Sequence, residues 1–450
     1  MNTDDLDPRE AEAERLGPGP PIKPGGLRRL LTSAAMDIGP LRRHRDFRLL
    51  FIGQGVSFLG SMITYVAFPF QAYELSHSSL VVGMLGVVEL VPLLASALVG
   101  GAIADAVDRR RMMQITELAF AAASAALVAN ALLPSPELWV IFVLAAIMAM
   151  LDGLQRPSLD ALTPRLVKRD EMAAAGALAS FRMTIGMVAG PAVGGILIAS
   201  IGLAATYAVD VATFAVSLIA LRMMRAVPPP AEAEPPSLRR IAEGAAFARS
   251  RPELVGTYAV DIVAMLFGMP EALFPAVAAG LGGAGALGLL FAAPAVGSLL
   301  ATVTSGWAGR VHRHGAAVCI AAAGWGIGIV VFGLAPNLPI ALAGLVLAGG
   351  ADMISGVFRS TIWNQTIPDE LRGRLAGIEQ VSYSTGPLLG NVEAGGVASL
   401  TSVQFSVVSG GLMCVAGVAV CIALLPAFWR YDSRTALAAT TPRSGGIIVP

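Results

Sequence analysis

Residues 80–111 read LVVGMLGVVELVPLLASALVGGAIADAVDRRR. Residues 80–104 are apolar apart from Glu89, and such a run is long enough to cross a hydrocarbon core of ~30 Å as a helix. The stretch ends in three consecutive arginines, Arg109 to Arg111, which are typical of a loop on the cytoplasmic side of a membrane. It therefore predicts a transmembrane helix that enters the cytoplasm near residue 105.

The rest of the chain repeats this pattern. Of its 450 residues, 55% are hydrophobic and 14% are charged, and the mean hydropathy is +0.70, a balance that does not fit a soluble protein. A helix satisfies its own backbone hydrogen bonds, which lipid cannot do. Twelve apolar runs are long enough to cross, at 49–73, 80–104, 112–133, 138–162, 176–200, 203–221, 254–279, 285–308, 316–335, 338–362, 375–398 and 403–428. The predicted fold is an all-α, polytopic membrane protein.

Lysine and arginine predict the orientation of these spans. They cluster before the first span and in every second connection, whereas the alternate connections 76–79, 134–137 and 335–339 hold none. Residues 1–46 are charged and rich in Pro and Gly, and the first apolar run is too long for a signal-peptide core, so we expect no cleaved signal. Both termini are therefore predicted to be cytoplasmic, with an even number of spans.

Weak similarity at a spacing near 200 residues divides the chain. Phe68-Pro69 recurs as Phe274-Pro275, and Pro92 recurs as Pro294, which favours two parallel six-helix halves. The predicted organisation is a cytoplasmic tail at 1–46, a first half at 47–222, a Pro-rich cytoplasmic linker with a short amphipathic helix at 223–252, a second half at 253–430, and a tail at 431–450.

Two motifs point to a family. Gly101, Asp105, Arg109 and Arg110, at the cytoplasmic end of the second span, resemble the loop 2–3 signature of the major facilitator superfamily. The resemblance implies a twelve-helix transporter in which this segment is a cytoplasmic latch that opens during transport, with the carboxylate near a facing helix terminus and the arginines pairing across the halves. The alternative to a latch is a turn without a role in transport, whose arginines only mark the cytoplasmic side.

The fifth span carries the second motif. Its small residues resemble the glycine-proline motif of exporters in the same superfamily, and they are Gly186, Gly190, Pro191, Gly194 and Gly195. Small residues four apart let helices approach closely, and an ordinary packing face is the alternative explanation. The sequence 367–374 after span 10 is similar to the branch that contains enterobactin exporters and macrolide efflux pumps.

Charged residues inside spans are costly in lipid, so each is either functional or paired. The candidates for transport or coupling are Asp210, Asp261, Glu271, Glu89 and Asp352. The first three have no basic partner on the same helix, whereas Asp352 shares a helix face with Arg359 and Asp152 shares one with Arg156. Hydrogen bonding between helices is the alternative role for every one of them.

The three cysteines lie in apolar runs without metal-ligand spacing, and neither lysine ends a GxxxxGK phosphate loop, so we expect no metal, no cofactor and no direct use of ATP. We expect a monomeric plasma-membrane protein that is not an enzyme and does not bind nucleic acid. Its predicted function is proton-coupled export of an amphipathic small molecule. A siderophore is the most specific substrate hypothesis. A macrolide-like drug pump, an importer of the same fold and a non-transporting membrane sensor are the alternatives.

The orientation is testable at the linker. A cysteine introduced as Pro235→Cys is expected to resist a membrane-impermeant thiol reagent in intact cells and to react after the cells are opened, because the linker is predicted to be cytoplasmic. Labelling in intact cells would contradict the predicted topology.

Overall fold

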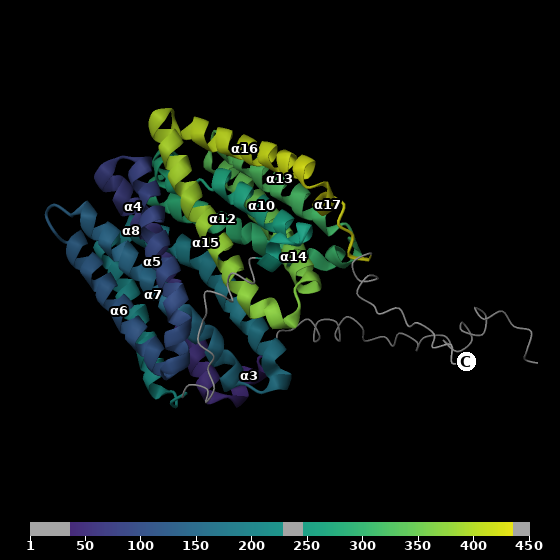
Figure 1. Ribbon diagram of the computed structural model, residues 1–450. Helices are drawn as coiled ribbons and strands as arrows, with labels where there is room; N and C mark the ends of the chain where they lie inside the picture. Colours follow the sequence, from purple (N-terminus) through teal and green to yellow (C-terminus); the bar gives the residue numbers. More distant parts are fainter. Residues whose placement is uncertain (1–36, 228–245, 435–450) are drawn as a thin grey trace, which may run out of the picture.

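The structure, a computed structural model, describes residues 37–227 and 246–434 (Figure 1). Within these ranges the regular elements are all helices, which confirms the predicted all-α class. Most of the two predicted tails and residues 228–245 of the predicted linker lie outside them, and the described linker residues 246–249 are helical. Figure 1 shows the helices before the linker on the left and those after it at the upper right.

We call the first set the amino-terminal helix group. It comprises α3 (Gly39–Arg43), α4 (Arg45–Ser76), α5 (Ser79–Ala106), α6 (Arg109–Ala131), α7 (Leu138–Leu166), η1 (Arg169–Glu171) and α8 (Met172–Met223). The carboxy-terminal helix group comprises α10 (Pro252–Phe267), η2 (Glu271–Leu273), α11 (Phe274–Leu281), α12 (Gly283–Val303), η3 (Ser305–Arg310), α13 (His314–Gly333), α14 (Leu338–Thr366), α15 (Asp369–Leu400), α16 (Val403–Leu424) and α17 (Pro426–Trp429).

Ten segments of the described chain are long and apolar enough to cross a membrane. One of them contains α8, whose 52 residues would extend for about 78 Å as a single helix. Gly202 interrupts α8 with a φ of 79°, a conformation that glycine adopts without steric cost, so we infer that α8 crosses twice. The predicted number of twelve would require a further crossing by α15, whose 32 residues include Glu379 and Glu393 and which is not among the ten.

The seventh predicted span is divided in the structure. Helix α10 ends at Phe267, and the chain passes through η2 before α11 begins at Phe274. The interruption falls around Pro270, which cannot donate a backbone hydrogen bond. The indole nitrogen of Trp325 donates to the carbonyl oxygen of Gly268 at 2.9 Å, so a side chain of α13 satisfies a backbone group beside the break.

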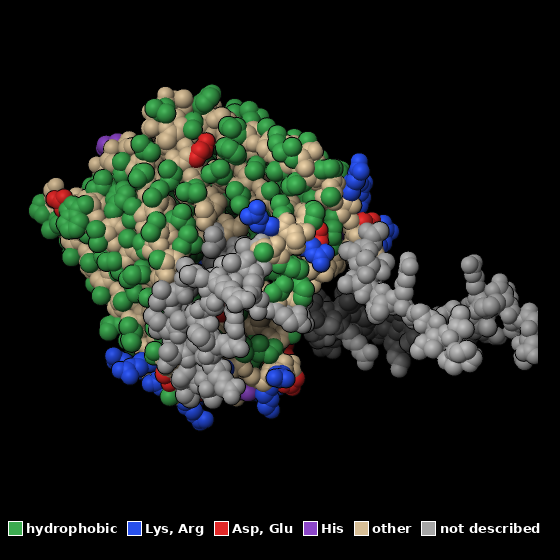
Figure 2. Space-filling view, in the orientation of Figure 1, with side chains coloured by type: hydrophobic (Ala, Val, Ile, Leu, Met, Phe, Trp, Pro, Cys, Tyr) green, Lys and Arg blue, Asp and Glu red, His purple; other side chains and the backbone are tan. Residues whose placement is uncertain are grey.

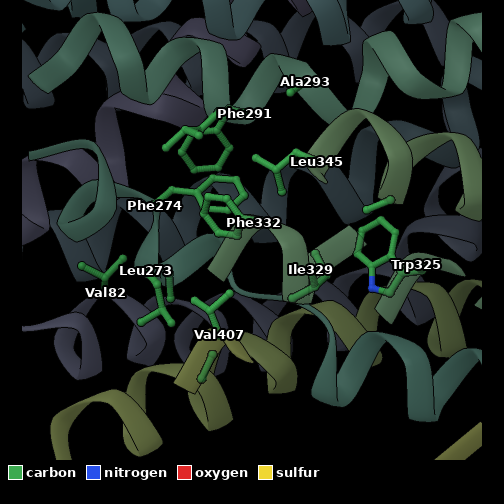
Figure 3. Close-up of a cluster of buried hydrophobic side chains, with 14 of the residues drawn as sticks. Val82, Leu273, Phe274, Phe291, Ala293, Trp325, Ile329, Phe332, Leu345 and Val407 are labelled. Carbon is green, nitrogen blue, oxygen red and sulfur yellow. The ribbon is translucent and has the colours of Figure 1, made fainter. Parts of the chain in front are cut away.

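A buried apolar cluster, to which both helix groups contribute, surrounds this break (Figure 3). The ring of Phe274 meets those of Phe291 and Phe332 edge-on, with centroids 5.0 and 5.4 Å apart. Edge-to-face geometry is favourable for aromatic pairs. The short helix α11 is therefore fixed against α12 and α13.

The small residues of span 5 lie on two faces of α8. A side-chain carbon added at Gly190 would lie 2.3 Å from Cβ of Met62 in α4. On the other face, an added carbon at Gly195 would lie 2.8 Å from the backbone of Gly288 in α12, which belongs to the other helix group. The predicted exporter motif thus allows α8 to approach both α4 and α12 at backbone distance.

The two helix groups meet toward one end of the molecule. Besides α8 with α12, α5 packs against α15, where an added carbon at Gly83 would lie 2.4 Å from the carbonyl oxygen of Asn391. Gly83 is near the start of α5, Asn391 is near the end of α15, and Gly195 precedes the Gly202 break. We call this end, where α4 finishes, the closed end.

The outer surface suits a lipid environment. Figure 2 shows hydrophobic side chains over most of the viewed face, whereas lysine and arginine gather mainly along the lower and right margins. Large apolar side chains are exposed on many helices, including Val303, Leu400 and Leu424, each more than 70% exposed. Exposed apolar area of this extent is rare on soluble proteins and typical of a lipid-facing surface.

Contact between α8 and α12 is expected to keep the closed end shut. Gly288→Leu should force the two backbones apart and let an impermeant thiol reagent applied outside cells reach a cysteine placed at Ser61, because an added carbon meets backbone atoms at 2.5–2.9 Å. Gly285→Leu on the same helix is the matched control, since an added carbon there meets nothing within 4 Å. Equal labelling in both variants would show that this contact does not control access.

Candidate functional site

A cavity of about 640 Å³ extends from the closed end toward the opposite end of the molecule, where α4 begins. It runs along α4 from Phe47 to Phe68, and α5, α6, α7 and α8 supply the rest of its wall. The carboxy-terminal helix group contributes Leu388 of α15. With the predicted orientation, the cavity faces the cytoplasm.

The wall combines apolar and charged side chains. Aromatic residues and methionines form its inner part, and they include Phe58, Met62, Tyr65, Phe120, Met148 and Phe214. Charged side chains also line it, and they are Glu89, Asp152, Arg156, Asp160 and Arg182. Asp152 and Arg156 pair at 3.9 Å, which confirms the pairing predicted from their i, i+4 spacing. Such a wall is typical of a site for an amphipathic small molecule.

Asp210 does not line this cavity. The Asp210 side chain in α8 is fully buried, and its carboxylate accepts hydrogen bonds from Thr64 of α4 at 2.6 Å and Ser124 of α6 at 2.8 Å. Thr213 donates to it at 3.3 Å. This geometry supports the interhelical hydrogen-bonding alternative, because the carboxylate joins three helices within one group.

Asp261 has a basic partner on another helix. The guanidinium of Arg359 in α14 is 3% exposed, and it forms an ion pair with Asp261 of α10. The same guanidinium lies 3.4 Å from Asp352 and 5.3 Å from the ring centre of Tyr383. Asp352 therefore contacts Arg359, as their shared helix face predicts. Same-helix spacing could not reveal the partner of Asp261.

Glu271 and Glu89 lie at the junction between the helix groups. Glu271 of η2 accepts a hydrogen bond from the hydroxyl of Tyr65 in α4, and both residues line a small cavity of about 70 Å³ toward the closed end. Glu89 of α5 lines this small cavity and the large one. Asn391 of α15 accepts from the backbone nitrogen of Ala272 at 2.8 Å. Two acidic side chains from opposite helix groups thus share one pocket.

The predicted latch lies at the other end. Gly101 and Asp105 are in the last turns of α5, and their side chains lie outside the described part of the structure. Arg109 donates to the carbonyl oxygen of Ala161 in α7 at 3.3 Å, and Arg110 donates to that of Met224. These hydrogen bonds stay within the amino-terminal helix group, whereas the resemblance implied pairing across the halves. The cavity opens on the part of the chain nearer this end, where α4 begins.

One buried cluster was not singled out from the sequence. Glu117 of α6 is 1% exposed and accepts hydrogen bonds from Gln54 at 2.7 Å and Gln155 at 3.0 Å. Ser57 donates to it at 3.1 Å. Gln54, Ser57 and Gln155 line the large cavity, whereas Glu117 lies behind them. Glu117 is recognisable as a charge inside a span, but its partners come from α4 and α7 and have no sequence signal.

Comparison with known proteins agrees with this arrangement. A family model described as "Transmembrane secretion effector" matches residues 35–443. The chain belongs to this family of major facilitator transporters. It is 28% identical to an enterobactin exporter from Citrobacter koseri over 85% of this chain and 92% of that protein. It is 27% identical to one from Shigella boydii serotype 4 over 87% of this chain and 94% of that protein.

Solved structures with the same fold are transporters too. A POT family transporter in complex with 5-aminolevulinic acid superposes with a TM-score of 0.68 at 12% identity, covering 86% of this chain and 97% of that one. The nucleoside transporter NupG gives 0.68 at 12% identity over 85% and 98%. At this identity the likeness shows the fold alone. This member of the secretion effector family is therefore a multi-pass membrane transporter and not an enzyme.

The Asp261–Arg359 pair is expected to stabilise the transporter. Arg359→Gln should lower the free energy of unfolding by about 3–5 kcal/mol, because it leaves a buried carboxylate without a counter-charge. The double variant Asp261→Asn with Arg359→Gln should recover part of that loss. Thermal unfolding of purified protein measures both, and equal loss in the single and double variants would show that the pairing itself contributes nothing.

Proposed function

We propose that this transporter exports amphipathic small molecules from the cytoplasm, driven by protons, through alternating access of two six-helix halves at 47–222 and 253–430. Support comes from the family description, from relatives named as exporters, and from a cavity lined by apolar and charged side chains, which faces the cytoplasm in the predicted orientation. Its volume falls within the range of about 300–1,000 Å³ for small-molecule sites. The plasma membrane is the proposed location, with both termini in the cytoplasm.

The observation that carries proton coupling is the position of Glu89 and Glu271. They project from opposite helix groups into one small cavity at the closed end, and Tyr65 bonds to Glu271 across the junction. Alternating access requires this junction to separate, which breaks the Tyr65–Glu271 contact and opens both carboxyl groups to the other side. A proton site whose surroundings change between the two states can drive the change.

The charge on Glu89 and Glu271 determines whether the closed end stays closed or opens. Two ionised carboxylates in one pocket repel each other, whereas protonation of one of them removes that repulsion. Protonation from the outside would therefore favour closure of this end and exposure of the cavity to the cytoplasm. Release of that proton to the cytoplasm, together with substrate binding, would favour the outward-facing state. This sequence gives exchange of an external proton for an internal substrate.

The substrate proposal rests on the relatives. Both named relatives are enterobactin exporters, so a siderophore is the first substrate to test, and macrolide-like drugs come second. We further propose that the transporter works as a monomer, because the cavity and the carboxyl pair lie within one chain.

Neutralising the junction carboxyl groups is expected to uncouple export. In inside-out vesicles, Glu271→Gln and Glu89→Gln should each abolish accumulation driven by a pH gradient while leaving downhill exchange and protein yield near wild type. Glu74→Gln is the matched control, because Glu74 is an exposed acidic residue on α4 that lines neither cavity. Asp210→Asn should instead reduce yield, because it weakens hydrogen bonds between three helices.

Three results would contradict the proposal. Full pH-gradient-driven transport by both junction variants would place coupling elsewhere. Accumulation into right-side-out vesicles with an inward proton gradient would make the protein an importer. Failure of wild-type protein to move labelled siderophores and macrolides in either direction, at normal yield, would favour the membrane-sensor alternative.

A further inference from the structure

The cavity wall near Glu117 has a fixed hydrogen-bonding polarity. An ionised carboxylate can only accept hydrogen bonds, so an amide side chain that contacts it must turn its nitrogen toward it. Gln54 directs its nitrogen to Glu117 at 2.7 Å and to Ser217 at 3.1 Å, which uses both of its hydrogens. Gln155 directs its nitrogen to the same carboxylate oxygen at 3.0 Å.

The amide oxygens are left facing the cavity. Gln54 and Gln155 line it, whereas Glu117 and Ser217 lie behind the wall, so the nitrogens point inward to the protein and the oxygens point the other way. Within the described residues, neither amide oxygen accepts a hydrogen bond. Neither oxygen is fully enclosed by protein atoms. Both are therefore accessible acceptors.

An aromatic surface lies beside these acceptors. Phe120 and Phe214 stack with ring centres 5.3 Å apart and an interplanar angle of 6°, and both line the cavity. Each is three residues from a member of the polar cluster, Phe120 from Glu117 and Phe214 from Ser217, so each lies about one helical turn away on the same side. The part of the wall beside the polar cluster is therefore apolar and aromatic.

We propose that this part of the cavity binds an apolar, ring-containing substrate through hydroxyl or amino hydrogens that it donates to Gln54 and Gln155. Glu117 is a positioning residue that fixes the two amides as acceptors and does not touch the substrate. The inference rests on the proposed small-molecule transport but assigns a chemical class to the substrate, because a molecule with only acceptor groups would leave both amide oxygens unpaired.

The test compares two probes that differ in one donor. Binding of 2-naphthol and of its methyl ether, 2-methoxynaphthalene, is measured on full-length protein in lipid nanodiscs, with empty nanodiscs subtracted. Wild-type protein should bind the naphthol roughly five- to tenfold more tightly than the ether, the size expected of one hydrogen bond to a neutral acceptor. The ratio of the two dissociation constants is the readout, because general loss of stability weakens both probes alike.

The variants identify which residues set this ratio. Gln155→Leu should lower it, because only the Gln54 oxygen then remains as an acceptor, and Glu117→Gln should also lower it, because a neutral amide at 117 lets either glutamine turn its nitrogen to the cavity. Gln71→Leu is the matched control, since Gln71 is buried on α4, bonds to Tyr207 at 2.8 Å and does not line the cavity. Its ratio should equal that of wild type.

Two outcomes would overturn the inference. A wild-type ratio near one, or no binding of either probe above empty nanodiscs, would show that the wall does not recognise donors. An unchanged ratio in Gln155→Leu and Glu117→Gln would assign recognition to other residues. The proposed function is tested separately, because uncoupled Glu271→Gln protein should keep the wild-type ratio of dissociation constants while losing proton-driven export.

Discussion

Lipid offers no hydrogen bonds, so every polar group inside the membrane must find its partner within the protein. This constraint explains the all-helical fold, and it also explains how the buried carboxyl groups are arranged. Asp210 is surrounded by hydroxyl donors, Glu117 by amides and hydroxyls, and Asp261 by a guanidinium. Each of these arrangements joins helices that are distant in sequence and lie in the same helix group. Satisfying a costly group thus also fixes the packing of that group.

Contacts between the two groups are of a different kind. They rely on close backbone approach, with Gly195 against Gly288 and Gly83 against Asn391. Small-residue contacts gain dispersion energy without forming strong directional bonds, so they can separate without leaving a buried polar group unsatisfied. The polar addition across this junction is the hydrogen bond from Tyr65 to Glu271. The junction is therefore suited to opening, whereas the interiors of the groups are suited to moving as rigid units.

The sequence predicted the helices well because crossing a membrane is a local property of an apolar run. The division of the seventh span also follows from local residues, since Pro270 cannot continue a hydrogen-bonded helix. Partners of the charged residues were predictable only at i, i+4 or i, i+7 spacing, as for Asp152 with Arg156 and Asp352 with Arg359. The partner of Asp261 and the cluster around Glu117 depend on which helices are neighbours, and spacing along a single sequence does not contain that information. The glycines of span 5 were predicted as an exporter motif, with an ordinary packing face as the alternative, and their division between α4 and α12 required the structure.

Where a carboxyl group lies also limits what it can do. A ligand shifts a conformational equilibrium only by the difference between its affinities for the two states. A proton on Asp210 or Glu117 sits among donors from a single helix group, and rigid rotation of that group leaves those donors in place. Its affinity for the proton would then hardly differ between the two states. Glu271 is bonded to Tyr65 across the junction and shares a small cavity with Glu89, so rotation changes both its hydrogen bond and its electrostatic surroundings. Among the carboxyl groups discussed, this pair is therefore the one we propose for coupling, whereas the cluster at Glu117 suits the proposed role of a constant surface that recognises substrate.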